Sequence, residues 1–150
     1  MELNISDAEM VVMRVIWSLG EAKVEDVERQ IAEKQQWSVA TIKTLLGRLV
    51  KKDILTTAKD GRCFVYHPTL AEDDAIALMG SELVDKVCAT KQKVLLRDMI
   101  LSSALTESDI AQLTEILADK ECVDKVECTC LEDFGNANCQ HEHEEMEMVN

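Results

Sequence analysis

The stretch SVATIKTLLGRLVKKD, residues 38–53, decides the fold. Its large apolar side chains recur at the three- and four-residue spacing of an amphipathic helix, so one face must pack against a core. These side chains belong to Ile42, Leu45, Leu46 and Leu49. The opposite face carries small, hydroxyl and cationic side chains and no acid. Such a face fits the major groove of DNA, where cations meet phosphates and hydroxyls meet base edges, although an ordinary solvent-exposed helix is the alternative.

Two further helices are predicted before this stretch. Ser6 and Glu9 have the spacing of a capping box, which predicts a helix that starts there and ends near Gly20. A second helix is expected over residues 24–33, followed by a polar turn and by Ser38, which is placed to cap the third helix. The order of helix, helix, short turn and helix is typical of a helix-turn-helix, although other small helical domains share it.

Two short runs of strand-forming residues follow, at residues 54–58 and 63–67. They are separated by Lys59-Asp60-Gly61-Arg62, whose Asp-Gly pair is a strong signal for a hairpin turn, and Pro68 ends the second strand. A hairpin with cations at its tip, directly after a cationic helix, indicates a winged helix-turn-helix whose wing reaches an adjacent phosphate or minor groove. A small module of helices and strands with an incidental basic turn is the alternative.

The charge is unevenly distributed along the chain. The formal net charge of -13 argues at first against a nucleic-acid partner, because phosphate contacts need cations. However, residues 1–70 are neutral, with ten cations and ten acids, and the excess of acid lies in residues 71–150. Residues 38–62 hold six cations and two acids, a local net charge of +4. The chain is therefore basic at one element and acidic at its end.

The pattern after Pro68 is helical. Helices are expected over residues 71–88 and 91–102, and Thr106 is placed to cap a third. Three helices of this length cannot easily bury so much apolar surface among themselves, so the sequence predicts a second subunit rather than a self-contained three-helix bundle. A dimer also suits DNA binding, because two reading helices about one helical turn of DNA apart strengthen a weak single contact.

Cysteine and histidine gather in an acidic segment at the end of the chain. Four of the six cysteines and two of the three histidines fall within 22 residues. These residues are Cys122, Cys128, Cys130, Cys139, His141 and His143. Thiolates and imidazoles suit zinc, and thiolates suit Cu(I) still better because both partners are soft. The Cys128-x-Cys130 spacing is shorter than the usual arm of a structural zinc site, which favours copper. Cys63 and Cys88 are interpreted as small apolar residues and His67 as structural.

Several functional classes are disfavoured by what the sequence lacks. The first residues have neither the basic nor the apolar region of an export signal, and no run reaches 18 apolar residues. We therefore expect a soluble, cytoplasmic protein whose reducing surroundings leave its thiols available as ligands. An enzyme is not expected, because no nucleophile, base and orienting acid are recognisable together and there is no glycine-rich phosphate loop.

Residues 37–52, with Leu55 and the Gly61-Arg62-x-Phe64-x-Tyr66-x-Pro68 pattern of the hairpin, resemble the penicillinase-repressor (BlaI/MecI) family of winged-helix repressors. The resemblance spans about residues 4–120 and implies a homodimer that binds a palindromic, double-stranded operator. The DNA-contacting residues that it implies are Thr41, Lys43, Thr44 and Arg48 on the reading helix and Lys59, Arg62 and Tyr66 in or near the wing. Lys51 is added because it lies on the same helix face.

The terminal cysteines extend this resemblance. A repressor of this family with a terminal Cys-x-Cys pair is similar to the CopY-type copper-responsive repressors. That similarity implies zinc in the operator-bound form and Cu(I) that displaces it, releases the DNA and opens transcription of copper-export genes; a copper chaperone that donates Cu(I) is a further expected partner. The CopY-type pattern has two Cys-x-Cys pairs four residues apart, whereas here eight residues separate Cys130 from Cys139 and the second pair is Cys139-x-His141. The expected ligands are Cys128, Cys130, Cys139 and His141, with Cys122 and His143 as substitutes.

The predicted fold class is mainly α with a small β-hairpin, in three parts. Residues 1–70 are expected to form the winged helix-turn-helix, residues 71–121 a helical dimerisation domain, and residues 122–150 an acidic, metal-binding tail. Two other functions stay open: a β-lactam-responsive repressor of the same family that is inactivated by proteolysis, and a dimeric metal-buffering protein without operator specificity. The first has no use for clustered thiols, and the second would leave no sequence-specific footprint on DNA.

Overall fold

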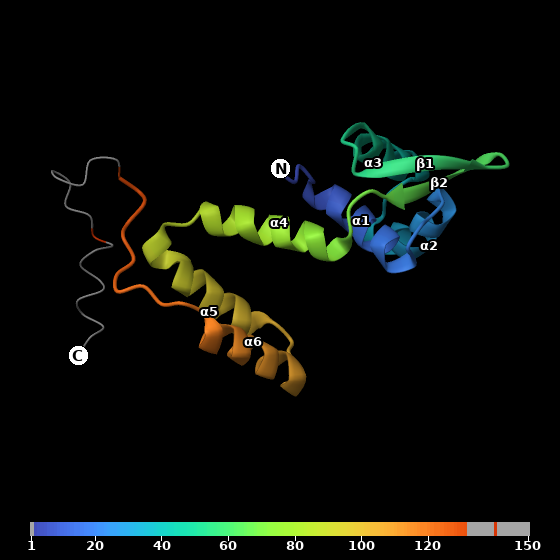
Figure 1. Cartoon of the computed structure of the whole chain (residues 1–150). Helices are drawn as coiled ribbons and strands as arrows, with labels where there is room; N and C mark the ends of the chain where they lie inside the picture. The colour runs from blue at the N-terminus through green and yellow to red at the C-terminus, as the bar shows by residue number, and fades with distance from the viewer. Residues whose placement is uncertain (1, 132–139, 141–150) are drawn as a thin grey trace. The chain divides into compact units, whose positions relative to one another are not determined.

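The computed structural model describes residues 2–131 and 140. The chain forms two compact units, residues 1–80 and residues 81–150 (Figure 1). The first unit holds three helices, a two-stranded hairpin and most of a fourth helix; the second holds the end of that helix, two further helices and a non-helical segment after residue 119. This arrangement confirms the predicted fold class.

Helix α1 (Asp7–Leu19) begins with the predicted capping box. The Ser6 hydroxyl accepts a hydrogen bond from the Glu9 backbone N–H at 3.2 Å, and the Glu9 carboxylate accepts one from the Ser6 N–H at 3.0 Å. Gly20 ends the helix at φ 85°, a conformation that glycine adopts without steric cost. The buried face of α1 includes Val12, Met13 and Ile16, which fixes this helix against the core.

Helices α2 (Val24–Gln35) and α3 (Val39–Lys51) complete the helix-turn-helix. Ser38 caps α3 as predicted, because its hydroxyl accepts from the Thr41 N–H at 3.2 Å. The four apolar residues that the opening stretch predicts for the core are all buried; they are Ile42, Leu45, Leu46 and Leu49. They join a single cluster with residues from α1 and α2, and this packing sets which face of α3 points outward.

Strands β1 (Leu55–Asp60) and β2 (Cys63–Pro68) form the predicted antiparallel hairpin, with Gly61 at φ 64° in its turn. The hairpin is attached to the segment between α1 and α2. The Tyr66 N–H donates to the Ala22 carbonyl at 2.8 Å, and the Ala22 N–H donates to the Tyr66 carbonyl at 3.1 Å. This extra bridge fixes the wing beside the helices.

The helices that follow are α4 (Glu72–Asp85), α5 (Gln92–Ser102) and α6 (Glu107–Asp119). Thr106 caps α6 as predicted. Helix α4 ends three residues before the predicted end at residue 88, because its last backbone bonds tighten and a short 3-10 turn, η1 (Ala89–Lys91), follows. The predicted first helix of this region is therefore too long, and Cys88 lies in the connection to α5.

Much apolar surface on these helices is exposed. Helices α5 and α6 contain no buried residue, and Leu101, Ile116 and Leu117 are each more than 60% exposed. Isolated exposed apolar side chains are common in folded proteins, whereas α5 and α6 each expose several of them. The part of the chain that the structure describes also contains no helix long and apolar enough to cross a lipid bilayer.

Candidate nucleic-acid interface and thiol cluster

The outward face of α3 carries every residue that was predicted for the reading helix. All five side chains are exposed: Thr41, Lys43, Thr44, Arg48 and Lys51. The Thr44 hydroxyl donates to the Ala40 carbonyl at 2.9 Å, and the hydroxyls of Ser38 and Thr41 lie 3.0 Å apart. The face is therefore cationic and free of acid, and its residues keep fixed positions because the opposite face is buried in the core.

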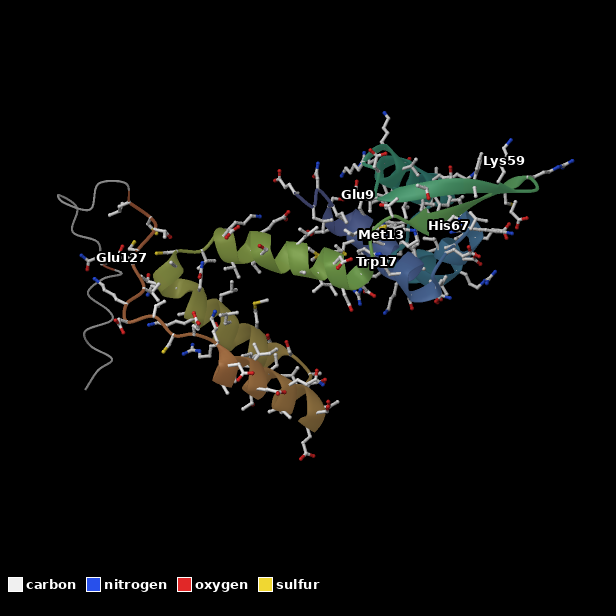
Figure 2. All side chains as sticks on the ribbon, in the orientation of Figure 1. Glu9, Met13, Trp17, Lys59, His67 and Glu127 are labelled. Atoms are coloured by element: carbon white, nitrogen blue, oxygen red, sulfur yellow. The ribbon has the colours of Figure 1, made fainter. Side chains whose placement is uncertain are left out.

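The wing carries two further cations. Lys59 is exposed near the tip of the hairpin (Figure 2), where its ammonium lies 6.0 Å from the centre of the Phe64 ring across the two strands. Arg62 is exposed in the turn itself. Asp60 is held 3.0 Å from the ammonium of Lys23, which raises the pKa of Lys23. Because Lys23, the residue before α2, pairs with this acid, the tip of the wing stays attractive to phosphate.

The reading helix and the wing are brought together across a hollow. It has a volume of about 570 Å³ and is bordered by α2, α3 and the hairpin. Lys43, Arg62 and Tyr66, which were predicted as DNA contacts, all line it. Tyr66 is half-buried and packs against the hydrophobic core, so it also anchors the wing. Glu25 and Glu28 line the α2 side of the hollow, which leaves the positive side on α3 and the turn.

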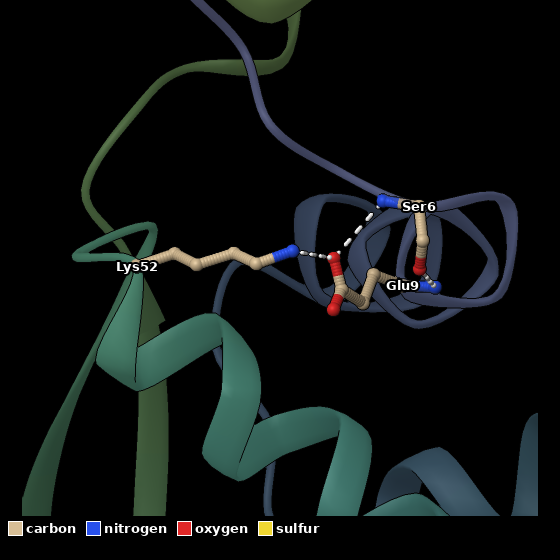
Figure 3. Close-up of polar contacts among 3 residues, drawn as sticks. All are labelled: Ser6, Glu9 and Lys52. Carbon is tan, nitrogen blue, oxygen red and sulfur yellow. Dashed lines mark hydrogen bonds and ion pairs between the residues drawn. The ribbon is translucent and has the colours of Figure 1, made fainter.

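One cation of the basic stretch is used inside the protein. The ammonium of Lys52 lies 2.7 Å from the Glu9 carboxylate, whose side chain is 2% exposed (Figure 3). Burial by itself raises the pKa of Glu9, but the Lys52 ammonium and the hydrogen bond from Ser6 outweigh it, so the pKa lies below its ordinary value. Lys52 therefore stabilises the fold and is not among the cations offered to DNA.

We expect Lys52→Met to lower the free energy of unfolding by about 1–3 kcal/mol at pH 7, because it leaves a buried carboxylate without its cation. A group whose folded pKa is lowered stabilises above its unfolded pKa, near 4.5 for Glu9, and loses this effect as pH falls through the folded pKa. The difference from wild type should therefore shrink below about pH 4.5 in urea titrations. Lys51→Met, at an exposed position, is the control. A deficit of equal size at pH 3 would contradict this role of the pair.

Three cysteine side chains meet in the second unit. The sulfur atoms of Cys88, Cys128 and Cys130 all lie within 4.8 Å of one another. The Sγ atoms of Cys88 and Cys128 are 3.5 Å apart, and the Cys130 N–H donates to Cys128 Sγ at 3.4 Å. Hydrogen bonds from the Thr90 hydroxyl and from the Thr129 backbone lower the pKa of Cys88 to about 5. A thiolate at neutral pH is the form that binds soft metal ions.

The cluster differs from the sequence interpretation at Cys88. Cys88 is not a small apolar residue on a helix face, because α4 ends before it and its sulfur points to the other two thiols. The structure brings Cys128 and Cys130 together and leaves Cys122 exposed outside the cluster. The remaining expected ligands, Cys139, His141 and His143, lie outside the described residues. His67 contacts the Glu21 carboxylate at 3.3 Å, in line with a structural role.

The first 119 residues carry the decisive similarity to known proteins. The family model described as "Penicillinase repressor" matches residues 5–119. This chain belongs to the penicillinase-repressor family. The family match confirms that the chain is a transcriptional repressor of the BlaI/MecI type and not an enzyme.

Relatives of this penicillinase-repressor chain cover most of its length. It is 38% identical to an uncharacterized 16.5 kDa protein of Latilactobacillus sakei over 93% of this chain and 95% of that protein. It is 32% identical to the penicillinase repressor of Bacillus licheniformis over 77% of this chain and 91% of that repressor. A solved structure described as "CopR Repressor Structure" is 60% identical, with a TM-score of 0.40, and covers 45% of this chain and 99% of its own.

The penicillinase-repressor match ends before the terminal cysteines. It covers Cys88, in the connection after α4, but stops nine residues before Cys128. The Latilactobacillus sakei relative, in contrast, aligns over nearly the whole chain. The DNA-binding unit is thus a property of the family, whereas the thiol cluster joins one residue from the family region to two from beyond it.

Proposed function

We propose that this chain is a copper-responsive transcriptional repressor. In its zinc-bound form it binds a palindromic operator as a homodimer, and Cu(I) displaces zinc at the cysteines near the C-terminus, which releases the DNA and derepresses copper-export genes. The observation that carries this proposal is the cluster of three thiols in a chain of a repressor family. A copper chaperone that donates the ion stays a prediction.

The DNA-binding half of the proposal rests on the first unit. The face of α3 and the tip of the wing both carry exposed cations, and Lys43 of α3 and Arg62 of the wing line the same hollow. A reading helix in the major groove and a wing on the adjacent phosphates are the usual contacts of this architecture. We assign DNA binding to residues 1–70, with Thr41, Lys43, Thr44, Arg48, Lys51, Lys59, Arg62 and Tyr66 as its contacts.

Dimerisation is assigned to residues 71–121. Their helices carry apolar side chains that the chain itself leaves exposed, including Ile76 at 55% and Leu101 at 75%. A second copy would cover these side chains and would also supply the second reading helix that a palindromic site requires. The residues after 121 are assigned to metal binding, with Zn²⁺ and Cu(I) as the exchanging ions.

A β-lactam-responsive repressor is the second candidate, because the Bacillus licheniformis relative is a penicillinase repressor. In that protein class the signal would be proteolysis, for which three converging thiols have no purpose. Metal buffering alone is a weaker candidate, because it gives no reason for an acid-free, cationic face on α3. Only copper responsiveness gives a role both to the thiol cluster and to the cationic face of α3.

We expect the zinc-loaded protein to bind its operator about 5 to 150 times more tightly than the Cu(I)-loaded protein, the range of a typical allosteric coupling. The test measures operator affinity by fluorescence anisotropy for the metal-free, zinc and Cu(I) forms at one salt concentration, since affinity for DNA depends on salt. A β-lactam sensor would bind equally in all three forms, and a metal buffer would bind operator and scrambled DNA alike.

The contact assigned to Lys43 makes a separate prediction. If its ammonium neutralises one phosphate, Lys43→Ala should reduce the slope of log affinity against log salt by about one unit and should weaken binding to all sequences. The slope is measured between low and physiological salt on operator and on scrambled duplexes. Lys93→Ala, an exposed lysine on α5, is the control and should leave the slope unchanged. An unchanged slope for Lys43→Ala would show that Lys43 does not contact a phosphate.

A further inference from the structure

The thiol cluster joins two segments that are far apart in the sequence. Cys88 comes from the connection between α4 and α5, and the other two cysteines come from the segment after α6. We propose that Cys88, Cys128 and Cys130 form one three-thiolate site for Cu(I), in which Cys88 ties the terminal segment to the helical unit. This inference rests on the proposed copper response for the choice of ion, and it adds a ligand that the Cys-x-Cys spacing does not indicate.

The distances fit a shared ion. Metal–sulfur bonds of about 2.3 Å place sulfur atoms about 3.8–4.0 Å apart in tetrahedral or trigonal sites. The Cys88 and Cys128 sulfurs are 3.5 Å apart, and all three lie within 4.8 Å of one another. Movements of no more than about 1 Å would therefore bring them around one ion. Soft thiolates favour Cu(I) over hard cations such as Mg²⁺ and Ca²⁺.

The surrounding contacts hold the thiols in place. The Ala89 N–H donates to the Thr129 hydroxyl at 3.2 Å, so the backbone next to Cys88 is bonded to the residue between the two terminal cysteines. Cys128 is 1% exposed, although its neighbours in the terminal segment are exposed, and Thr90 beside Cys88 is 4% exposed. Burial of a cysteine in an otherwise exposed segment indicates that the segment is docked at this point. Cys130, the third member of the cluster, is exposed.

Binding requires no redox step. Cu(I) forms three bonds to sulfur, and each thiol that is still protonated releases its proton to solvent. The loaded site then holds one Cu(I) ion and three thiolates, so its net charge is negative. Because Cys88 directly precedes η1 and α5, the ion links the terminal segment to the helices that we assign to dimerisation. Copper in this site would thus act on the dimer through the start of α5.

The test compares Cys88→Ser with Cys63→Ser in the full-length, reduced protein. Cys63 is an exposed cysteine on β2, in the other unit, and serves as the matched control. Cu(I) affinity is measured by competition with a chromophoric Cu(I) chelator, and the number of sulfur ligands by X-ray absorption at the copper edge. We expect Cys88→Ser to lose one sulfur ligand and at least about tenfold in affinity, since even outer partners of metal ligands cost 10- to 100-fold. Cys63→Ser should match wild type.

Equal affinity and an unchanged sulfur count in Cys88→Ser would overturn the inference. Circular dichroism melts of both variants establish that they are folded, and Cys88→Ala repeats the test without the serine hydroxyl. Operator release by Cu(I) is measured on the same samples. If Cu(I) releases the operator from wild type, and Cys88→Ser keeps the wild-type Cu(I) affinity and sulfur count, this inference is wrong and the proposed function stands. If Cys88→Ser loses a sulfur ligand but Cu(I) does not release the operator from wild type, the three-thiolate site stands and the proposed function is wrong.

Discussion

Cu(I) should not release the operator from the double variant Cys128→Ser, Cys130→Ser. Both sulfurs belong to the thiol cluster, and Cys128 is its most buried member. A ligand shifts an equilibrium only by its difference in affinity for the two states, so a protein that has lost two of its thiolates has lost that difference. The response of about 5 to 150 fold that we expect for wild type should therefore fall to less than about twofold.

The measurement is an anisotropy titration of Cu(I) into the preformed complex of protein and operator. Cys122→Ser is the matched control, because Cys122 is exposed and lies outside the cluster. Cu(I) should release the operator from Cys122→Ser as it does from wild type. The double variant should bind the operator as tightly as metal-free wild type does, which separates loss of the response from loss of folding. Full release of the double variant by copper would remove these cysteines from the mechanism.

Leu46→Ala should destabilise the DNA-binding unit by about 2–5 kcal/mol. Leu46 is fully buried on α3 and packs in the cluster that joins the three helices. The substitution removes apolar burial and leaves a cavity that the neighbouring side chains fill only in part. Since this packing also fixes the outward direction of Lys43 and Arg48, operator binding should weaken together with stability.

Urea unfolding at a fixed protein concentration measures the effect, since dimerisation makes the apparent stability depend on concentration. Leu19→Ala makes the same chemical change at a side chain that is 49% exposed at the end of α1, and it should cost clearly less. Similar losses for the two variants would mean that Leu46 does not lie in the core as described.

Local signals account for most of what the sequence predicts of the first unit. The Ser6 and Glu9 capping box, the periodic leucines of α3 and the Asp60-Gly61 turn each depend on residues within a few positions of one another, and the structure contains all three features. The pairing of Glu9 with Lys52 spans 43 residues, and no local pattern indicates it. Counting cations in the sequence therefore includes Lys52 among those available to DNA, whereas the structure pairs Lys52 with Glu9.

Cys88 shows the same limit at the thiol cluster. It stands 40 residues before Cys128 and at the end of an apolar helical pattern, where a cysteine is normally a small core residue. No local signal indicates its role, because the apolar pattern continues to Val87 although α4 ends at Asp85. The contact itself depends on how the chain returns after α6, which only the three-dimensional structure defines.

The bond from the Thr44 hydroxyl to the Ala40 carbonyl has a consequence for base selection. Its only hydrogen is already donated within α3, so this oxygen can act solely as an acceptor toward a base edge. In the major groove, adenine and cytosine present amino hydrogens, whereas guanine presents two acceptors. If Thr44 contacts a base, as proposed, an amino-bearing base should therefore be preferred over guanine at that position of the operator.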